Sequence, residues 1–269
     1  MRLSPLPPDF SAAADEAWRL VSAAPGFLTE REARFLALAA ACVPAQGVIL
    51  EIGSFKGKST VGLASVAARY RLGKVVAVDP HTAPSSTDPG LGGQASSFDD
   101  FRHTLTRAGL TDHVEVHRKF SHELATRWDR PIRLLWIDGD HTYPGAKQDL
   151  DLFAPHLAPG GVVALHDVLH NFAGPIRVFV EDVLGSDRYG PAGCCGSIGW
   201  AQHRPVDGAS ARFREARGAL ARRAARLIPL SERGRDLRGV AKLRYKLQRA
   251  LVPHGGADPE TWAQLTSDV

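Results

Sequence analysis

The chain has 269 residues, of which 44% are hydrophobic, and a formal net charge of +4 from 33 Lys and Arg against 29 Asp and Glu. A chain of this length and composition buries a substantial core, which excludes a disordered protein and suits one α/β domain with extensions. No stretch approaches the roughly 20 apolar residues of a membrane span, and residues 1–10 lack the apolar segment of a signal peptide. We therefore expect a cytoplasmic protein with no membrane partner. Its cysteines form no Cys-x-x-Cys pair, so we expect reduced thiols.

Positive charge is concentrated toward the C-terminal end. Residues 206–253 carry 13 Lys and Arg against four Asp and Glu. We expect a helical lead-in at residues 1–27, a central domain at residues 28–204 and a basic helical extension at residues 205–269. Apolar residues of that extension form a partial helical stripe: Leu220, Leu227, Leu237, Val240, Leu243, Leu247 and Leu251. We expect the stripe to pack on the domain or on a second subunit of a homo-oligomer, and an anionic partner such as nucleic acid is the alternative.

Apolar periodicity predicts alternating helices and strands along most of the chain. In chain order we expect helices over residues 12–23, 29–42, 59–70, 98–108, 121–128, 143–156 and 176–184, and strands over residues 48–52, 74–78, 113–118, 133–137 and 162–165. Thr29 and Glu32 form a capping box at the second helix, and Ser121 can cap the fifth. Residues 196–202 look like the second half of a terminal hairpin. The alternation predicts a doubly wound, Rossmann-like, mostly parallel sheet with helices on both faces and ligands at the carboxyl ends of the strands.

The turn after the first strand has the features of a nucleotide-type site. Gly53 and Gly57 allow backbone N–H groups to approach a ligand at the start of a helix. Gly57-Lys58-Ser59 suggests a Walker phosphate loop, but that loop needs four residues between its first glycine and the Gly-Lys pair, and this turn has one fewer. A phosphate-binding module that depends on Lys58 therefore remains only the alternative to a cofactor turn.

Two acidic residues favour the cofactor turn. Asp79 ends the second strand, where a carboxylate suits the two hydroxyls of a ribose. Glu51 ends the first strand and suits a positively charged amino group better than a phosphate. The dehydrogenase pattern Gly-x-Gly-x-x-Gly is absent, because Phe55 stands two positions after Gly53.

The motif Glu51-Ile-Gly53-Ser-Phe-Lys-Gly57 resembles the first motif of the class I S-adenosylmethionine-dependent methyltransferases, Glu/Asp-x-Gly-x-x-x-Gly. The similarity covers about residues 28–202 and includes Asp79, Ser121, the stretch Asp138-Gly-Asp-His-Thr-Tyr143, and Pro159-Gly-Gly161 leading to His166-Asp167. It implies a set of residues around S-adenosylmethionine: Glu51, Gly53, Ser54, Gly57, Ser59, Asp79, Ser121 and Asp138. In this family the methionine end would lie near the glycine turn, the ribose at Asp79 and the adenine beside Ser121.

Acidic and histidine side chains follow the next two strands of the sheet. Asp138, Asp140 and His141 end the fourth strand, and His166 and Asp167 end the fifth. If these strands are neighbours, their carboxylates meet and repel unless a cation or a proton intervenes. Oxygen ligands suit Mg²⁺ or a similar ion. A metal site and a metal-free site with a histidine base are the two interpretations.

This arrangement is similar to the metal-dependent small-molecule O-methyltransferases of the catechol, macrolide-sugar and cephalosporin-hydroxylase-like types. The similarity implies that Asp138 and Asp167 hold the ion and that His141 is the general base, a role that suits an imidazole of pKa near 6.5. His166 departs from the pattern, because relatives often carry an acidic or amide residue there. We count His166 as a third metal ligand, with Mg²⁺ as the expected ion. An imidazole ligand would shift the preference toward Mn²⁺, Fe²⁺ or Zn²⁺, and the alternative is that His166 only contacts the substrate.

The resemblance predicts an enzyme that methylates a hydroxyl of a small molecule, either a sugar or a natural-product scaffold. We expect the acceptor to be surrounded by His170, Asn171, residues 191–197 and the long Ser- and Gly-rich loop at residues 81–97. An RNA-directed methyltransferase guided by the basic extension is the enzyme alternative.

Overall fold

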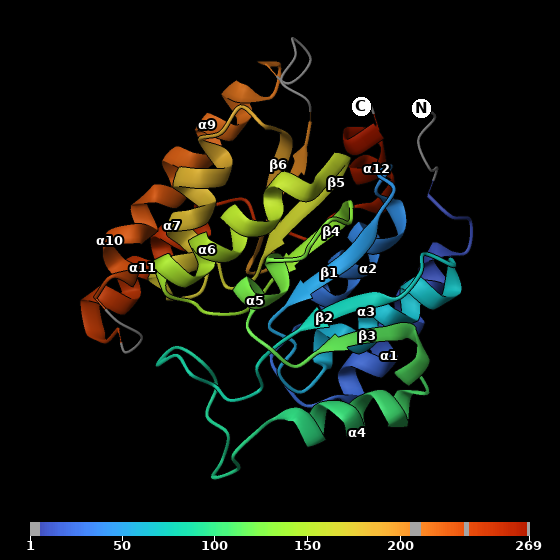
Figure 1. Ribbon diagram of the computed structural model, residues 1–269. Helices are drawn as coiled ribbons and strands as arrows, with labels where there is room; N and C mark the ends of the chain where they lie inside the picture. Colours follow the sequence, from blue (N-terminus) through green and yellow to red (C-terminus); the bar gives the residue numbers. More distant parts are fainter. Residues whose placement is uncertain (1–5, 205–210, 234–236, 268–269) are drawn as a thin grey trace.

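The computed structural model describes residues 6–204, 211–233 and 237–267. A seven-stranded sheet runs through the molecule in the order β3-β2-β1-β4-β5-β7-β6 (Figure 1). Its strands are β1 (Val48–Ile52), β2 (Val75–Val78), β3 (Val114–His117), β4 (Ile132–Ile137), β5 (Leu157–Leu165), β6 (Tyr189–Cys195) and β7 (Ile198–His203). Strands β1 to β5 are parallel, and β6 and β7 form an antiparallel hairpin at the edge next to β5. The predicted mostly parallel Rossmann-like sheet is confirmed.

Helices cover both faces of this sheet (Figure 1). One layer contains α1 (Phe10–Ala23), α2 (Glu30–Cys42), α3 (Lys58–Arg69), α4 (Phe98–Ala108) and α12 (Pro259–Ser267). The other contains α5 (Ser121–Ala125), α6 (Tyr143–Phe153), α7 (Ala173–Val178), α9 (Arg214–Ala224), α10 (Ile228–Ser231) and α11 (Gly239–Ala250). Short helical turns complete the two layers at η1 (Thr111–His113), η2 (Ala154–His156), η3 (Phe179–Leu184) and η4 (Ala225–Leu227). No helix within these described ranges is long and apolar enough to cross a bilayer.

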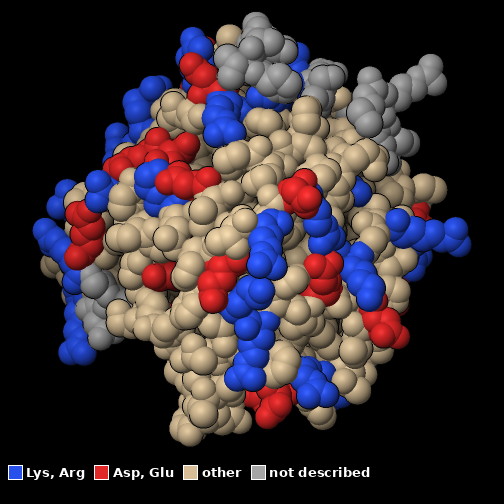
Figure 2. All heavy atoms as spheres, viewed as in Figure 1, with Lys and Arg blue, Asp and Glu red and all other residues tan. Residues whose placement is uncertain are grey.

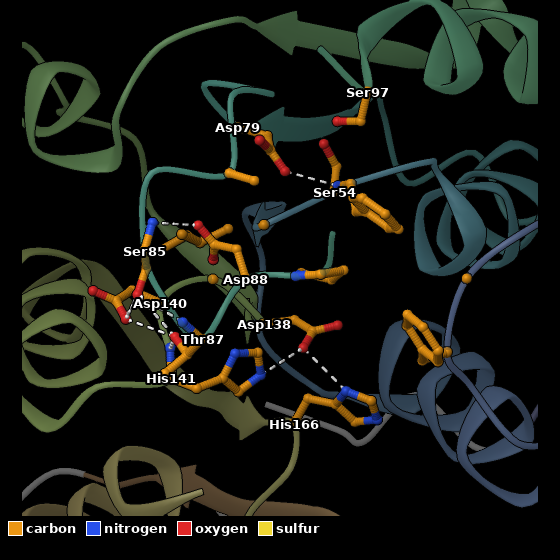
Figure 3. Close-up of a pocket in the computed structure, with 18 of the residues that line it drawn as sticks. Ser54, Asp79, Ser85, Thr87, Asp88, Ser97, Asp138, Asp140, His141 and His166 are labelled. Carbon is orange, nitrogen blue, oxygen red and sulfur yellow. Dashed lines mark hydrogen bonds and ion pairs between the residues drawn. The ribbon is translucent and has the colours of Figure 1, made fainter. Parts of the chain in front are cut away.

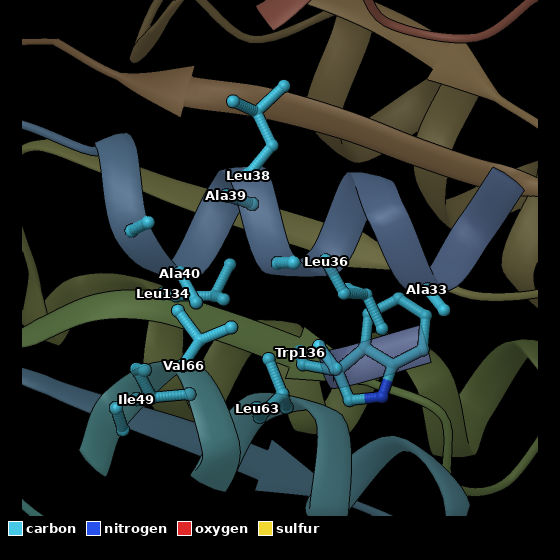
Figure 4. Close-up of a cluster of buried hydrophobic side chains, with 14 of the residues drawn as sticks. Ala33, Leu36, Leu38, Ala39, Ala40, Ile49, Leu63, Val66, Leu134 and Trp136 are labelled. Carbon is cyan, nitrogen blue, oxygen red and sulfur yellow. The ribbon is translucent and has the colours of Figure 1, made fainter. Parts of the chain in front are cut away.

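Strand β4 shows how the sequence builds both layers. Leu134 and Trp136 face the α1–α3 side, whereas Leu135 and Ile137 face the α6–α7 side. Successive side chains of a strand point to opposite faces, so an uninterrupted apolar run is what a strand covered on both faces requires. Figure 4 shows Leu134 and Trp136 among side chains of α2 and α3. The central position of β4 places the residues that follow it in the middle of the sheet's carboxyl edge.

Both terminal extensions pack into the cores of the domain. Val21 of α1 is fully buried in the first core, together with strand residues. Trp262 of α12 lies edge-on to Phe35 and Trp200, with ring centroids 6.1 and 5.6 Å apart. Helix α12 is not among the helices expected from the sequence, because its anchoring depends on these distant aromatic residues. We propose residues 1–27 as a helical lead-in, residues 28–204 as the central domain and residues 205–269 as a basic helical extension. Helices α1 and α12 contribute to the same core as the central domain.

Glu32 joins helix α2 to the β6–β7 hairpin. Its Oε2 accepts hydrogen bonds from the N and Oγ1 of Thr29, at 2.9 and 2.7 Å, in the predicted capping box. Its Oε1 accepts from the N and Oγ of Ser197, at 2.7 and 2.6 Å. The carboxylate is buried, so its removal leaves buried donors without acceptors.

We therefore expect Glu32→Ala to lower the free energy of unfolding by about 2–4 kcal/mol. Urea titration followed by circular dichroism measures the change. Glu30→Ala is the matched control, because Glu30 lies in the same turn but is exposed and pairs with Arg34 on the surface. That control should cost less than about 1 kcal/mol. An equal decrease in the free energy of unfolding in the two variants would show that the buried contacts of Glu32 do not stabilise the fold more than a surface ion pair does.

Candidate active site

A cavity of about 1140 Å³ opens at the carboxyl ends of β1, β2, β4 and β5. Its wall combines the turn after β1, the loop at residues 81–97, the segments after β4 and β5, and the α1–α2 linker. Ligand pockets commonly measure about 300–1,000 Å³, so this one has room for a nucleoside cofactor and a small acceptor together. The topology explains its place, because ligands of doubly wound sheets bind at this edge.

The glycine turn has the conformation that the sequence predicts. Gly53 has φ 84°, and a Cβ there would collide with the carbonyl oxygen of Asp138 on the neighbouring strand's end. Gly57 has φ 85° and is the residue before the first turn of α3. Both positions favour glycine for its access to the left-handed region. The turn therefore lies against the end of β4, and its backbone is close to that of Asp138.

The predicted cofactor residues fall into two groups. Those that line the cavity are Gly53, Ser54, Ser59, Asp79, Ser121 and Asp138. Glu51 and Gly57 do not line it. Glu51 is fully buried beneath the turn, where its carboxylate accepts hydrogen bonds from Ser59 and Thr60, and burial raises its pKa to about 8. The structure thus gives Glu51 a role in shaping the start of α3.

Asp79 connects the end of β2 to the glycine turn. Its Oδ2 accepts a hydrogen bond from the N of Phe55 at 2.7 Å, and its Oδ1 accepts from the N of His81 at 2.6 Å. Phe55 and His81 have positive φ values of 43° and 59°, which side chains of this size rarely adopt. The carboxylate holds both backbones in place and still lines the cavity.

Lys58 lines the cavity, but its ammonium group is bound to the end of α1. Its Nζ donates to the carbonyl oxygens of Val21 and Ala24, at 2.9 and 2.7 Å, at the end of α1. A cation suits the negative end of a helix. The Gly-Lys-Ser sequence is thereby explained by helix packing, without a nucleotide phosphate.

Ser121 pairs with a buried acid that the sequence analysis did not identify. It is the first residue of α5, whose cap position is Phe120, so Ser121 is not the predicted helix cap. Its Oγ donates to Asp149 Oδ1 at 2.5 Å. Burial raises the pKa of Asp149 to about 7, and this side chain also lines the cavity. Asp149 lies on α6, where its helical spacing gave no sign of a role in the site.

Four side chains after β4 and β5 converge as expected, and Figure 3 shows three of them, Asp138, His141 and His166. His141 Nε2 lies 3.2 Å from Asp167 Oδ2 and 3.6 Å from Asp138 Oδ1. His166 Nδ1 lies 3.0 Å from the same oxygen of Asp138, which therefore stands between the two imidazoles. Asp167 has φ 56° and also contacts His170 Nδ1 at 2.5 Å. Because β4 and β5 are neighbours, their ends form one cluster.

Charge is strongly coupled within this cluster. Burial opposes the protonated form of His141, but the carboxylates of Asp138 and Asp167 outweigh it and raise its pKa to about 9. The same carboxylates raise the pKa of His166 well above its usual value against the effect of burial. The pKa of Asp167 is lowered, because the two imidazoles outweigh the cost of burying its charge.

The donor set fits a divalent metal ion. Ligand atoms of Asp138, His141 and Asp167 all lie within 4.8 Å of one another. Two carboxylates and an imidazole are ligands that divalent ions accept in proteins. His166 Nδ1 is also close to Asp138, at 3.0 Å. Either His141 or the predicted ligand His166 could therefore supply the nitrogen ligand of the ion.

The long loop at residues 81–97 is attached to the end of β4. Ser85 and Thr87 donate their hydroxyl protons to Asp140 Oδ1, at 2.9 and 3.1 Å. Thr87 Oγ1 also accepts from the backbone N of His141 at 3.1 Å. Residues 83–85 and 87–91 line the cavity, so the loop forms part of its wall. Figure 3 shows this contact on the side of Asp138 opposite His166.

Two segments expected near the acceptor lie elsewhere. Residues 191–197 and Asn171 are not part of the cavity wall; Ser197 instead contacts Glu32. Phe172 takes the neighbouring place, with its ring stacked on His141 at a centroid distance of 4.3 Å. The β6–β7 turn lies at the carboxyl end of β5, where Gly199 pairs with Leu165, but it turns toward α2 and contacts Glu32 there, outside the cavity wall.

Residues 50–168 match a family model described as a methyltransferase domain. This part of the chain contains the glycine turn, Asp79 and the Asp138–Asp167 cluster. These residues form a methyltransferase domain. The sequence-based resemblance is thereby confirmed for the central part of the chain.

Solved structures share the fold of this methyltransferase. The cofactor-bound structure of Rv0187 from MTB is 21% identical, with a TM-score of 0.53 over 73% of this chain and 90% of that one. TomG, an O-methyltransferase from Streptomyces achromogenes solved with S-adenosylmethionine, is 22% identical, with a TM-score of 0.52 over 74% and 90%. CalS11, a calicheamicin methyltransferase, is 17% identical, with a TM-score of 0.51 over 72% and 93%.

Proposed function

We propose that this methyltransferase transfers a methyl group to a hydroxyl of a small molecule, a sugar or a natural-product scaffold. The observation that carries the proposal is the position of His141, Asp138 and Asp167 together on the wall of a cavity large enough for cofactor and acceptor. TomG and CalS11, which share the fold, are named for O-methyl transfer and for a natural product.

We assign the methyl donor to the β1–β2 side of the cavity. Gly53, Ser54 and Ser59 would hold its methionine end, Asp79 its ribose and Ser121 its adenine, as the family resemblance implies. The acceptor would then enter between the long loop and Phe172. His141 would take the hydroxyl proton as the oxygen attacks the methyl carbon in line with the departing sulfur.

Asp138 and Asp167 would hold a divalent ion, with Mg²⁺ as the expected one and His166 as the expected third ligand. Such an ion, when bound, orients the acceptor's hydroxyl and lowers its pKa. Asp167 supports this role, because an aspartate at φ 56° directs its carboxylate back toward Asp138 and His141. A homo-oligomer remains a prediction.

Methyl transfer to a library of small hydroxyl compounds, measured as S-adenosylhomocysteine release, tests the function. We expect turnover with Mg²⁺ and a loss of about 10²-fold with a chelator. Asp167→Asn should lower turnover by a similar factor, because asparagine tolerates the left-handed backbone but carries no charge to hold the ion. Turnover that survives both changes would refute the metal. Calorimetry that detects no binding of S-adenosylmethionine would refute the enzyme itself.

A further inference from the structure

Helix α11 exposes a stripe of aliphatic side chains. Val240, Leu243, Leu247 and Leu251 are 82%, 58%, 60% and 52% exposed. Their spacing of three or four residues places them on one face of the helix. Tyr245 occupies the opposite face and is buried in the second core. Leu220 and Leu227 of the predicted stripe are buried in the second core, as expected, whereas the part of the stripe on α11 faces outward.

Basic side chains flank this stripe. At 100° per residue, Lys246 lies along one side of it and Arg244 along the other, whereas Lys242 lies farther round the helix, toward Tyr245. All three are exposed, and no ion pair joins them to another residue in the part of the chain that the structure describes. Figure 2 shows Lys and Arg gathered along the left edge of the molecule, where Figure 1 places α10 and α11.

The charge of α11 decides between possible occupants. Residues 237–252 contain no Asp or Glu and five cations: Arg238, Lys242, Arg244, Lys246 and Arg249. Pairing this face with the same face of a second copy would bring like charges together. A nucleic acid would leave the aliphatic side chains without a partner, and Tyr245 is buried and unable to stack on bases. A partner protein would need a groove and roughly 1,200–2,000 Å² of interface, whereas α11 offers a single ridge.

We propose that α11 binds the surface of an anionic lipid bilayer. An apolar ridge between cations suits the boundary between acyl chains and anionic headgroups, where a helix lies parallel to the membrane. This peripheral binding requires no membrane-spanning helix, but it departs from the sequence-based expectation of no membrane partner. The inference rests on α11 alone and goes beyond the proposed methyl transfer.

Vesicle flotation of the full chain tests the proposal. Wild-type protein should float with vesicles of phosphatidylcholine and phosphatidylserine, and remain largely unbound with phosphatidylcholine alone or at high salt. We expect the double variant Leu243→Ser/Leu247→Ser to bind roughly tenfold less or worse. Lys242→Glu/Lys246→Glu should lose binding as well. Leu265→Ser is the matched control, because Leu265 is exposed on α12, in the other layer.

Each other outcome overturns the proposal. Equal binding to neutral and anionic vesicles, or no binding to either, would refute the proposal that α11 binds an anionic lipid surface. A dimer, seen by light scattering, that the Leu243→Ser/Leu247→Ser variant dissociates would assign the stripe to a second copy. RNA binding that persists in the same variant, without vesicle binding by wild type, would assign the cations to nucleic acid. Circular dichroism of each variant shows whether the fold is intact, and methyl transfer plays no part in these measurements.

Discussion

His141→Asn should lower the rate of methyl transfer by about 10²–10⁴-fold while leaving the affinity for S-adenosylmethionine close to wild type. His141 lies on the acceptor side of Asp138, with Nε2 beside Asp167 and its ring stacked on Phe172. Removing the imidazole removes the proton acceptor, whereas Asp138, 3.6 Å away, is the one residue of the expected cofactor set that His141 contacts among the described residues. Single-turnover methyl transfer and calorimetry measure the two effects separately.

A second measurement distinguishes a base from a metal ligand. Mn²⁺ affinity, followed by electron paramagnetic resonance, should stay within a few-fold of wild type in His141→Asn and fall by about 10–100-fold in Asp167→Asn. Equal falls in both would make His141 a ligand and leave the base unassigned. His113→Asn is the control for the substitution itself, because His113 is exposed in η1, outside the cavity wall. It should change neither the rate nor the affinity.

The pH dependence distinguishes metal-assisted from metal-free transfer. With both carboxylates charged and no ion bound, the pKa of His141 is about 9, so its imidazole is protonated at neutral pH and cannot accept a proton. Any transfer that relies on His141 in the presence of a chelator should therefore increase as pH rises toward and through 9. A flat profile between pH 6 and 9 under those conditions would remove His141 as a metal-free base.

Local patterns in the sequence were enough to predict the sheet and the glycine turn. Gly53 and the apolar run of β4 are determined by backbone clearance and by burial on both faces, which neighbouring residues reveal. The position of Glu51 was predictable as well, but its burial was not. Ser59 and Thr60 of the following helix donate hydrogen bonds to its carboxylate. Glu51, which the sequence suggested as a cofactor ligand, is therefore occupied by contacts inside the protein.

Contacts between distant segments were beyond prediction. Glu32 was recognised as a helix cap, yet its second oxygen binds Ser197, which is 165 positions away in the sequence. The stripe on α11 was recognised as apolar, but only the packing of Tyr245 decides which face of that helix is buried. Periodicity identifies an amphipathic helix and leaves open what covers each face. The same limit hid Asp149, whose role depends on a hydrogen bond to Ser121.

Asp79→Ala should weaken S-adenosylmethionine binding by about 100-fold, or about 2.8 kcal/mol at 1.4 kcal/mol per tenfold. A carboxylate that accepts from both ribose hydroxyls contributes charge-assisted hydrogen bonds of about 1.5–3 kcal/mol each, part of which is offset by desolvation. Calorimetric titration measures the loss. Asp112→Ala, an exposed substitution in η1, should leave the dissociation constant unchanged.

The contacts of Asp79 with Phe55 and His81 create a second route to the same loss, because the variant also frees the glycine turn. A double-mutant cycle with S-adenosylhomocysteine and its 2′-deoxy analogue separates the two routes. If the carboxylate reads the ribose, wild type should prefer the hydroxylated ligand by about tenfold or more, and Asp79→Ala should bind both alike. If the carboxylate only orders the turn, the variant should keep the full preference while binding both ligands more weakly. The ligand's hydroxyl therefore reports whether Asp79 acts on the cofactor directly or through the backbone of Phe55.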